Sequence, residues 1–583
     1  MTVRYDADAL RAMKFTSTRC LLLLIAGAAM SAAGADLQAG LDAYNRGDYS
    51  RAASEFRPFA EAGVPMAQYS MGKLHAEGRG LPKDYKVAAA WYRKAAEQGY
   101  ALAQFNLGRL YERGQGVERN FESAAEWYRR AGEQGRSYAQ YHLGLLYQSG
   151  RGVTQNHAEA ARWYRRAAEQ GYPPAQFKLG ESYHRGRGAA RDDKEAVKWY
   201  RLAADQGLAD AQFLVALAYQ DGRGVEQSDA AAAKWHRAAA DQGLSRAQYQ
   251  LALLYGNGQG VPQDYAEAAR LLEKPAREGN SDALYRLGTM YAQGQGVERD
   301  EVRAVALYRE AAERGSAEAQ FNLGLMHFQG RGVERSPEKA ADWYAKAASQ
   351  GDPKAQQTLA MLYQRGQGVA KDDGAAAYWF GRAAEAGQMY PQALASYRKG
   401  ANLGHHGSEF SVGRLYFAGL GVEKDRGQAI EWYHKAAEGG VAEAQAGLGV
   451  LYERGDGVGQ NLAQAIAWYR KAADQNQPEG LYNLGAAYEH GGGVERDATE
   501  AACLYERAAR LGVAEAQVAL AAMHQDGRGV EQDNVRAYAY LQLAAEKDQA
   551  TAQERLSALG GVLSAEEVEQ ARRLAWDLSE SGK

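Results

Sequence analysis

The chain has 583 residues, of which 46% are apolar and 24% are charged, and its formal net charge is −3 at pH 7. This length exceeds what one compact core supports, so several domains or one elongated repeat architecture is expected. A slightly acidic chain lacks the basic face of a general nucleic-acid-binding protein, and 67 glycines beside only 11 prolines exclude a Pro/Gly-rich disordered chain.

The amino terminus has the composition of an export signal. Lys14 and Arg19 precede an apolar run over residues 20–30, and small residues follow up to Ala35. This order predicts a signal peptide over residues 1–35 and a mature protein that is periplasmic or secreted. The run is too short to span a bilayer, so no membrane insertion is expected after cleavage. Acidic residues ahead of Met13 leave open whether Met1 or Met13 is the true start.

From residue 65 the sequence repeats with a period of 36. The repeated feature is the first glycine of a Gly-x-Gly pair, which occurs at Gly78, Gly114, Gly150, Gly186, Gly222, Gly258, Gly294, Gly330, Gly366, Gly419, Gly455, Gly491 and Gly527. A fixed period in this range indicates stacked supersecondary units. A glycine-rich phosphate loop would follow a strand, and no strand pattern precedes these loops, so they are interpreted as joints between helices.

Each repeat predicts two helices. In the unit over residues 101–135, apolar residues at helical spacing form a first helix that ends at Gly114, and a second helix runs from Asn120 to Gly135. We name these the A helix and the B helix. N-cap residue types start every B helix, at Asp84, Asn120, Asn156, Asp192, Ser228, Asp264, Asp300, Ser336, Asp372, Asp425, Asn461, Asp497 and Asp533.

A column of small residues lies six positions before each loop glycine. It comprises Gly72, Gly108, Gly144, Gly180, Ala216, Ala252, Gly288, Gly324, Ala360, Gly413, Gly449, Gly485 and Ala521. Glycine inside a helix costs about 1 kcal/mol relative to alanine, so a close approach of a neighbouring helix is predicted here. The B-helix tryptophans are predicted to fill that space, at Trp91, Trp127, Trp163, Trp199, Trp235, Trp343, Trp379, Trp432 and Trp468.

The repeat "AQFNLGRLYERGQGVERNFESAAEWYRRAGEQG" resembles the Sel-1-like repeat, a relative of the tetratricopeptide repeat, over about residues 65–547. The resemblance implies an all-α fold, a right-handed superhelical solenoid of αα-hairpins, that holds protein partners on its concave face without a cofactor. Exported bacterial members include periplasmic and secreted proteins. A cysteine-rich branch is associated with β-lactam binding and hydrolysis, but its paired cysteines are absent here, so that activity is not implied.

The predicted organisation has six parts. A signal peptide covers 1–35, a tetratricopeptide-like unit without the long loop covers 36–64, repeats with nine loops cover 65–388, an insertion of one extra helix covers 389–407, repeats with four loops cover 408–547, and capping helices cover 548–583. The insertion is either a tolerated irregularity or a joint between two arms. In the last part, Ser564 and Glu567 predict a capping box, with Val568, Ala571, Ala575 and Leu578 on one apolar face.

An aromatic column two positions before the A-helix leucines is the candidate partner-binding site. Its predicted members are Tyr69, Phe105, Tyr141, Phe177, Phe213, Tyr249, Tyr285 and Phe321, and Phe410 and Tyr482 occupy the same column. Rigid aromatic anchors dominate many protein interfaces. The alternative is that these rings only pack between adjacent helices.

No catalytic, cofactor or metal site is predicted. His405 and His406 have Glu409 nearby but no further ligand at helical spacing, and Cys503, beside a core leucine, is expected to be buried. The predicted function is therefore a non-enzymatic periplasmic scaffold or adaptor for protein partners. Two alternatives remain: an envelope hydrolase directed at peptidoglycan or β-lactams, and a secreted protein that recognises a host.

Overall fold

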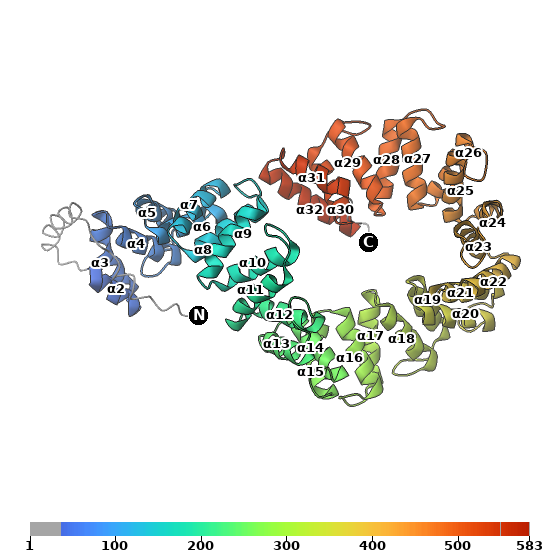
Figure 1. Cartoon of the computed structure of the whole chain (residues 1–583), viewed down its shortest axis with the longest axis horizontal. Helices are drawn as coiled ribbons and strands as arrows, with labels where there is room; N and C mark the ends of the chain where they lie inside the picture. Colours follow the sequence, from blue (N-terminus) through green and yellow to red (C-terminus); the bar gives the residue numbers. More distant parts are fainter. Residues whose placement is uncertain (1–36, 548–549, 582–583) are drawn as a thin grey trace. The chain divides into compact units, whose positions relative to one another are not determined.

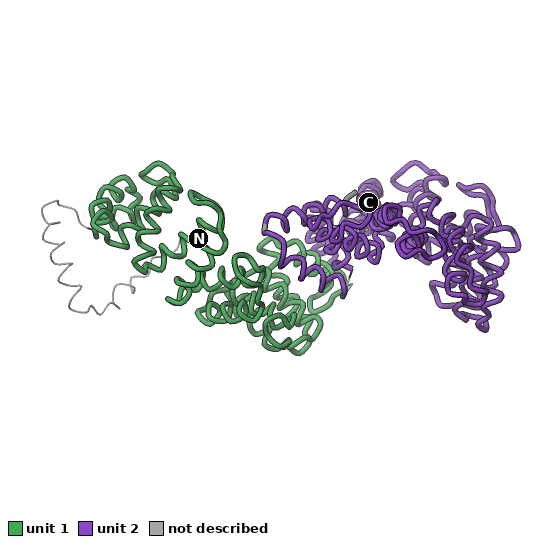
Figure 2. The backbone as a smooth tube through the Cα atoms, turned by 90° about the horizontal axis from the view of Figure 1, so that it is seen from above, with its two compact units in different colours: residues 1–264 green, residues 265–583 purple. Residues whose placement is uncertain are grey.

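The computed structural model describes residues 37–547 and 550–581, and within these ranges it contains 31 α-helices and no strand (Figure 1). The predicted signal peptide lies outside the described residues. The chain divides into two compact units between residues 264 and 265 (Figure 2).

In the first unit the helices are α2 (Leu37–Asn45), α3 (Tyr49–Glu61), α4 (Pro65–Glu77), α5 (Tyr85–Glu97), α6 (Ala101–Arg113), α7 (Phe121–Glu133), α8 (Ser137–Ser149), α9 (His157–Glu169), α10 (Pro173–Arg185), α11 (Asp193–Asp205), α12 (Ala209–Asp221), α13 (Asp229–Asp241) and α14 (Ser245–Asn257). In the second unit they are α15 (Tyr265–Arg277), α16 (Ser281–Gln293), α17 (Glu301–Glu313), α18 (Ala317–Gln329), α19 (Pro337–Ser349), α20 (Pro353–Arg365), α21 (Asp373–Ala386), α22 (Tyr390–Asn402), α23 (His406–Ala418), α24 (Arg426–Glu438), α25 (Ala442–Arg454), α26 (Leu462–Asp474), α27 (Pro478–His490), α28 (Ala498–Arg510), α29 (Ala514–Asp526), α30 (Asn534–Ala545), α31 (Ala550–Gly560) and α32 (Ala565–Ser581).

Within each unit, every repeat is one A helix packed on its B helix, and each B helix packs in turn on the A helix that follows. α6 contacts α7, and α7 contacts α8, and the same order continues through the unit. The predicted all-α solenoid of αα-hairpins is confirmed. Predicted N-caps also form: the Asn120 side chain accepts a hydrogen bond from the Ser123 backbone N–H at 2.8 Å.

The two loop glycines have different tasks. Gly114 ends α6 in the left-handed backbone conformation, with φ = 67°, as predicted for a glycine at a helix end. Its N–H donates to the Leu110 carbonyl. Gly116 also has a positive φ, 72°, and a Cβ there would lie 2.6 Å from the Lys86 backbone nitrogen at the start of the preceding B helix. The second glycine therefore lets each loop pack on the backbone of the previous repeat, a contact that the sequence pattern did not predict.

The small-residue column does mark a close helix approach, but the predicted partner is wrong. A Cβ at Gly108 would lie 2.9 Å from the ring of Tyr128, and all nine glycines of the column face the B-helix tyrosine twenty positions later. Where the column has alanine, the residue twenty positions later is His236, Leu272, Phe380 or Leu541. Glycine thus occurs at this column only where a tyrosine must fit against it.

The tryptophans lie one position before the residue that faces the small-residue column, about 100° around the helix, and most lie at the margin of the core. Seven of the nine are half-buried, among them Trp91 and Trp127, whereas Trp163 and Trp199 are buried. A cation three residues later covers the ring in several repeats: Lys94 Nζ lies 4.4 Å from the centroid of Trp91, and Lys346 Nζ lies 4.1 Å from that of Trp343. Tyrosine and alanine form the buried stripe of the B helix, and most of the tryptophans cover the edge of that stripe.

The extra segment is one helix, α22, which contacts both α21 and α23. It reproduces the repeat packing with a B helix in place of an A helix, because a Cβ at Gly381 of α21 would overlap the ring of Tyr397. The Tyr397 hydroxyl also donates to Glu385 Oε2 at 2.8 Å. α22 therefore continues the stack of the second unit without a gap.

The last helix closes the apolar end of the second unit. Ser564 and Glu567 form the predicted capping box, with the Ser564 N–H donating to Glu567 Oε2 at 2.8 Å and the Glu567 N–H to Ser564 Oγ at 3.3 Å. Ala571 and Ala575 are buried, and α32 contacts α30. The amphipathic capping face is confirmed.

Candidate partner-binding face

The aromatic column lies along the A helices, and its rings are half-buried except for Phe213, which is only 8% exposed. In eight members of the column, one side of the ring packs on the B-helix tyrosine of the same repeat. The ring centroids are paired as Tyr69–Tyr92 (5.8 Å), Phe105–Tyr128 (5.7 Å), Tyr141–Tyr164 (6.0 Å), Phe177–Tyr200 (5.7 Å), Tyr285–Tyr308 (6.0 Å), Phe321–Tyr344 (5.4 Å), Phe410–Tyr433 (5.5 Å) and Tyr482–Tyr505 (5.7 Å). These distances lie in the range of tilted aromatic pairs.

In the first repeats the same rings also reach the next A helix. The centroids of Tyr69 and Tyr100 are 5.3 Å apart, and those of Phe105 and Tyr138 are 4.7 Å apart. Tyr141 meets Tyr172 in the same way, at 5.5 Å. Over these first repeats the column therefore forms a layer of rings that reaches the start of each following A helix and is fixed from below by the B-helix tyrosines. Rings held in this way lose little conformational freedom when a partner covers them.

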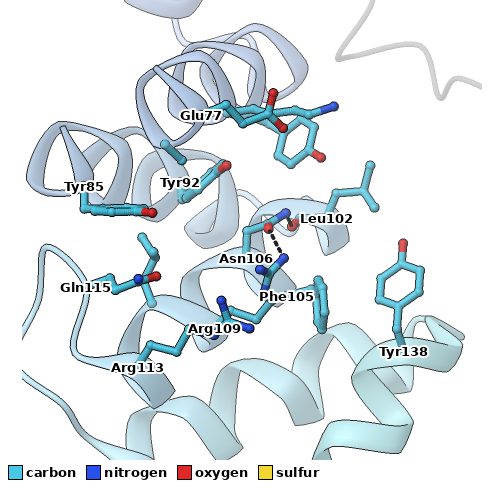
Figure 3. A pocket seen from close by; sticks show the side chains of 14 residues that line it. Glu77, Tyr85, Tyr92, Leu102, Phe105, Asn106, Arg109, Arg113, Gln115 and Tyr138 are labelled. Atoms are coloured by element: carbon cyan, nitrogen blue, oxygen red, sulfur yellow. Dashed lines mark hydrogen bonds between the residues drawn. The ribbon is translucent and has the colours of Figure 1, made fainter. Parts of the chain in front are cut away.

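An open pocket of about 460 Å³ lies on this face in the first unit (Figure 3). Its walls come from α4, α5, α6 and α8, and include the column residues Tyr69 and Phe105 together with Leu102, Arg109 and Tyr138. A pocket of this size accommodates a few side chains of a partner. The predicted column thus contributes two of its members to one pocket, whereas the remaining predicted members do not line it.

Asn106, which lines the pocket, donates from Nδ2 to the Leu102 carbonyl at 2.9 Å, and a further hydrogen-bonded pair lies beside the pocket. The Tyr128 hydroxyl donates to Glu112 Oε2 at 2.5 Å. Burial opposes the charged form of Glu112, but His142, whose Nδ1 lies 3.5 Å from Glu112 Oε2, and the hydrogen bond from Tyr128 outweigh it and hold the pKa of this carboxyl below its usual value. Burial, together with the Glu112 charge, raises the pKa of Tyr128. Glu112 is therefore an anion that hydrogen-bonds within the protein.

A second repeated network consists of buried glutamines and was not predicted from the sequence. Gln104 of α6 donates to the Ala96 carbonyl at 3.1 Å and accepts from Gln134 Nε2 at 2.8 Å. The same pair joins residues thirty apart in other repeats, for example Gln170 to Gln140 at 2.8 Å. The signal was the Ala-Gln pair that ten of the thirteen A helices carry and the Gln that precedes the glycine after many B helices, such as Gln134 before Gly135. These bonds tie consecutive repeats together.

The histidines of the extra segment have structural partners. His406 Nδ1 lies 2.8 Å from Glu409 Oε2, and His405 caps α23 by accepting from the Ser408 N–H at 3.1 Å. Across residues 37–547 and 550–581, His, Cys, Asp and Glu side chains form no group of three or more that could hold a metal ion.

The cap made by His405 predicts a pH-dependent stability. Protonation would place a hydrogen on Nδ1, which now accepts, and burial keeps the pKa of His405 below its usual value, with Asp372 opposing this shift. Since the unfolded chain takes up the proton first, the stability from this cap is complete above about pH 6.5 and is lost as the pH falls through the depressed folded pKa. Melting curves between pH 7.5 and 5 should show a smaller loss for His405→Asn, which caps without titrating. Equal losses in both proteins would contradict the role of the cap.

The expectation for Cys503 is wrong, because this cysteine is exposed. The buried stripe of α28 contains Ala501, Leu504, Tyr505 and Ala508. At 100° per residue, position 503 lies on the opposite side of the helix, so sequence proximity to Leu504 was misleading. Cys503 is the one cysteine in the part of the chain that the structure describes.

Among the described residues, no helix is both long enough and apolar enough to cross a membrane. This result concerns the helices α2–α32 alone.

Comparison with known proteins matches the Sel1 repeat thirteen times between residues 65 and 549, with residues 389–406 unmatched. A solved structure of a protective antigen present in uropathogenic Escherichia coli strains is 35% identical, with 84% of this chain and 94% of that chain covered and a TM-score of 0.45. A Sel1 repeat protein from Oxalobacter formigenes is 33% identical, with 61% and 99% covered and a TM-score of 0.42. No curated protein matches.

Sel1 repeat proteins generally mediate protein–protein interactions and are generally not catalytic. The family's repeat covers most of the solenoid, including the loops, the A helices and the B helices. The chain belongs to the Sel1 repeat family.

Proposed function

We propose that this chain is an exported, non-enzymatic scaffold of the bacterial envelope that holds a protein partner on the face formed by its A helices. The observation that carries the proposal is the half-buried ring layer of the first unit, from Tyr69 to Phe177, together with the open pocket that two of its rings line. The rings are fixed on one side and half-exposed overall, which suits a preorganised interface. The amino-terminal sequence pattern supports export to the periplasm.

The test is capture of partners from the envelope fraction of the source bacterium with the purified chain. The comparison variant changes Phe105, Tyr141 and Phe177 to leucine, which removes the rings but retains apolar volume. Phe213 is left in place because it is buried. The proposal expects a protein that is captured by the natural chain and reduced about 10-fold or more by the variant.

A matched control separates lost binding from lost folding. In the control, the half-buried B-helix residues Trp91, Trp127 and Trp235 are changed to leucine, which removes three rings from the other helix of the repeat. Both variants are compared by circular dichroism and melting. Capture that persists in the A-helix variant, or that is lost equally in both variants, contradicts a partner surface on the A helices.

A further inference from the structure

The pocket of Figure 3 differs from the rest of the A-helix face in its charge. Arg109 and Arg113 of α6 and Lys73 of α4 line it, with Glu77 as its lining carboxylate. Glu77 is already paired with Arg79 at 3.3 Å. Neither Arg109 nor Arg113 forms an ion pair with a carboxylate among the described residues. The lining residues therefore carry more positive than negative charge in a chain that is acidic as a whole, and Glu112, the anion beside the pocket that Arg113 also stabilises, is already hydrogen-bonded to Tyr128.

This charge belongs to the pocket and is not a general property of the repeat. At the position of Arg109, the following repeats of the first unit have Leu145, Glu181, Leu217 and Leu253. Arg414 holds the same position in the second unit, where it is ion-paired with Glu385. The repeat scaffold tolerates apolar residues here, so folding does not require an arginine at position 109.

Apolar residues are concentrated at the same place. The second position of the A helix is Met66, Leu102, Tyr138 and Pro174 in the first four repeats, and it becomes Asp210 and Arg246 in the next two. Leu102 and Tyr138 both line the pocket and are half-buried. Tyr138 is packed on Phe105, and the Arg109 guanidinium lies 5.8 Å from the centre of the Phe105 ring.

Figure 3 shows how these groups are arranged. Arg109 lies between Asn106 and Gln115 within the pocket, and Phe105 and Tyr138 stand together on its side toward α8. Within the described part of the chain, the one hydrogen bond that restrains the Arg109 guanidinium is long, with Nη1 3.5 Å from Asn106 Oδ1. A guanidinium with weak restraint beside an aromatic wall can accept a carboxylate at little cost, because no existing ion pair has to be broken.

We infer that this pocket binds a short acidic segment of the partner protein, in which an aspartate or glutamate side chain meets Arg109 and Arg113 and a neighbouring apolar side chain packs on Phe105, Leu102 and Tyr138. Charge complementarity selects this occupant over a basic or purely apolar one. The pocket is lined from α4, α5, α6 and α8, so a segment that fills it contacts more than one repeat. The inference rests on the proposed function and specifies the chemistry of the partner.

The test uses the full chain and a phage-displayed library of random peptides. Each peptide is inserted within the coat protein, so that it offers no free carboxyl terminus. Selected peptides are then synthesised with amidated ends. The inference expects enrichment of sequences in which an acidic residue adjoins a leucine or an aromatic residue. Replacing the acid by its amide, or raising the ionic strength from about 0.05 to 0.5 M, should weaken binding about 10-fold.

The decisive variant exchanges the two arginines for the residues that the next repeat uses, Arg109→Leu as in Leu145 and Arg113→Ser as in Ser149. Because the fold already carries these residues in the next repeat, the variant should melt like the natural chain. It should bind the selected peptides about 10-fold more weakly. The matched control is Arg185→Ser, at the position of Arg113 two repeats later and outside the pocket, which should leave binding unchanged.

The outcomes separate this inference from the broader proposal. The pocket assignment would be overturned if acidic peptides bound the Arg109→Leu/Arg113→Ser variant as tightly as the Arg185→Ser control. It would also be overturned if the library yielded no acidic peptides. If the selected peptides then still depend on Tyr141 and Phe177, the A-helix face remains a partner surface. Peptides unaffected by either set of changes would overturn both.

Discussion

Changing Gly116 to alanine is expected to reduce the free energy of unfolding by about 3 kcal/mol. The positive φ of 72° would strain an alanine, and its Cβ would also meet the backbone of Tyr85 and Lys86 in the preceding B helix. Backbone atoms cannot move aside as a flexible side chain can. The measurement is thermal and urea unfolding of the full chain, with amide hydrogen exchange of α5 and α6 to locate the loss.

Gly135→Ala is the matched control for this prediction. Gly135 has a similar φ of 84°, but a Cβ there has nothing within 4 Å. The control therefore loses only the conformational contribution, about 1 kcal/mol, and the difference between the two variants measures the contact between repeats. Equal losses for Gly116→Ala and Gly135→Ala would show that the second loop glycine is a local turn residue without a role in stacking.

A second large effect is expected at the helix contact of Gly108 with Tyr128. Gly108→Ala places a methyl group 2.9 Å from the Tyr128 ring and should destabilise the fold by about 2 kcal/mol. Tyr128→Leu removes a fully buried ring and the hydrogen bond to Glu112, and should cost about 3 kcal/mol. The double variant reproduces the pair Ala252 and Leu272, which the chain already uses.

The two changes should therefore compensate each other. The double variant is expected to lose about 1–3 kcal/mol less free energy of unfolding than the two single variants lose together. A double-mutant cycle on the full chain measures this difference. Additive losses would mean that glycine is present at position 108 for a reason other than the tyrosine. The pairing of nine glycines with nine tyrosines would then have no packing explanation.

The period, the loop glycines and the N-caps could be predicted because they depend on local backbone chemistry. Gly114 ends a helix and Asn120 caps one, and the hydrogen bonds by which they do so join residues a few positions apart in the sequence. Glycine and asparagine are the residue types that these backbone positions favour. The small-residue column also showed that helices approach closely. Its partner was misassigned because Trp127 and Tyr128 are adjacent, and only the rotation of the B helix decides which of two large rings points at Gly108.

Contacts between repeats were harder to predict, since one residue must be matched to another about thirty positions away. The glutamine pair Gln104 and Gln134 and the packing of Gly116 on the preceding B helix are of this kind. The pocket was not predicted either, although the aromatic column identified Phe105 as one of its residues. The importance of Arg109 depends on the absence of an ion pair, which a sequence does not reveal.

The most direct test of the central proposal is site-specific photo-crosslinking in cells of the source bacterium. A photoreactive phenylalanine analogue replaces Leu102, on the A-helix face, and in a second strain it replaces Arg130, which is exposed on the B helix α7. The proposal predicts a defined protein adduct from position 102, formed in the periplasm, and none from position 130. Adducts from position 130 alone, or equal adducts from both positions, would contradict a partner surface on the A helices.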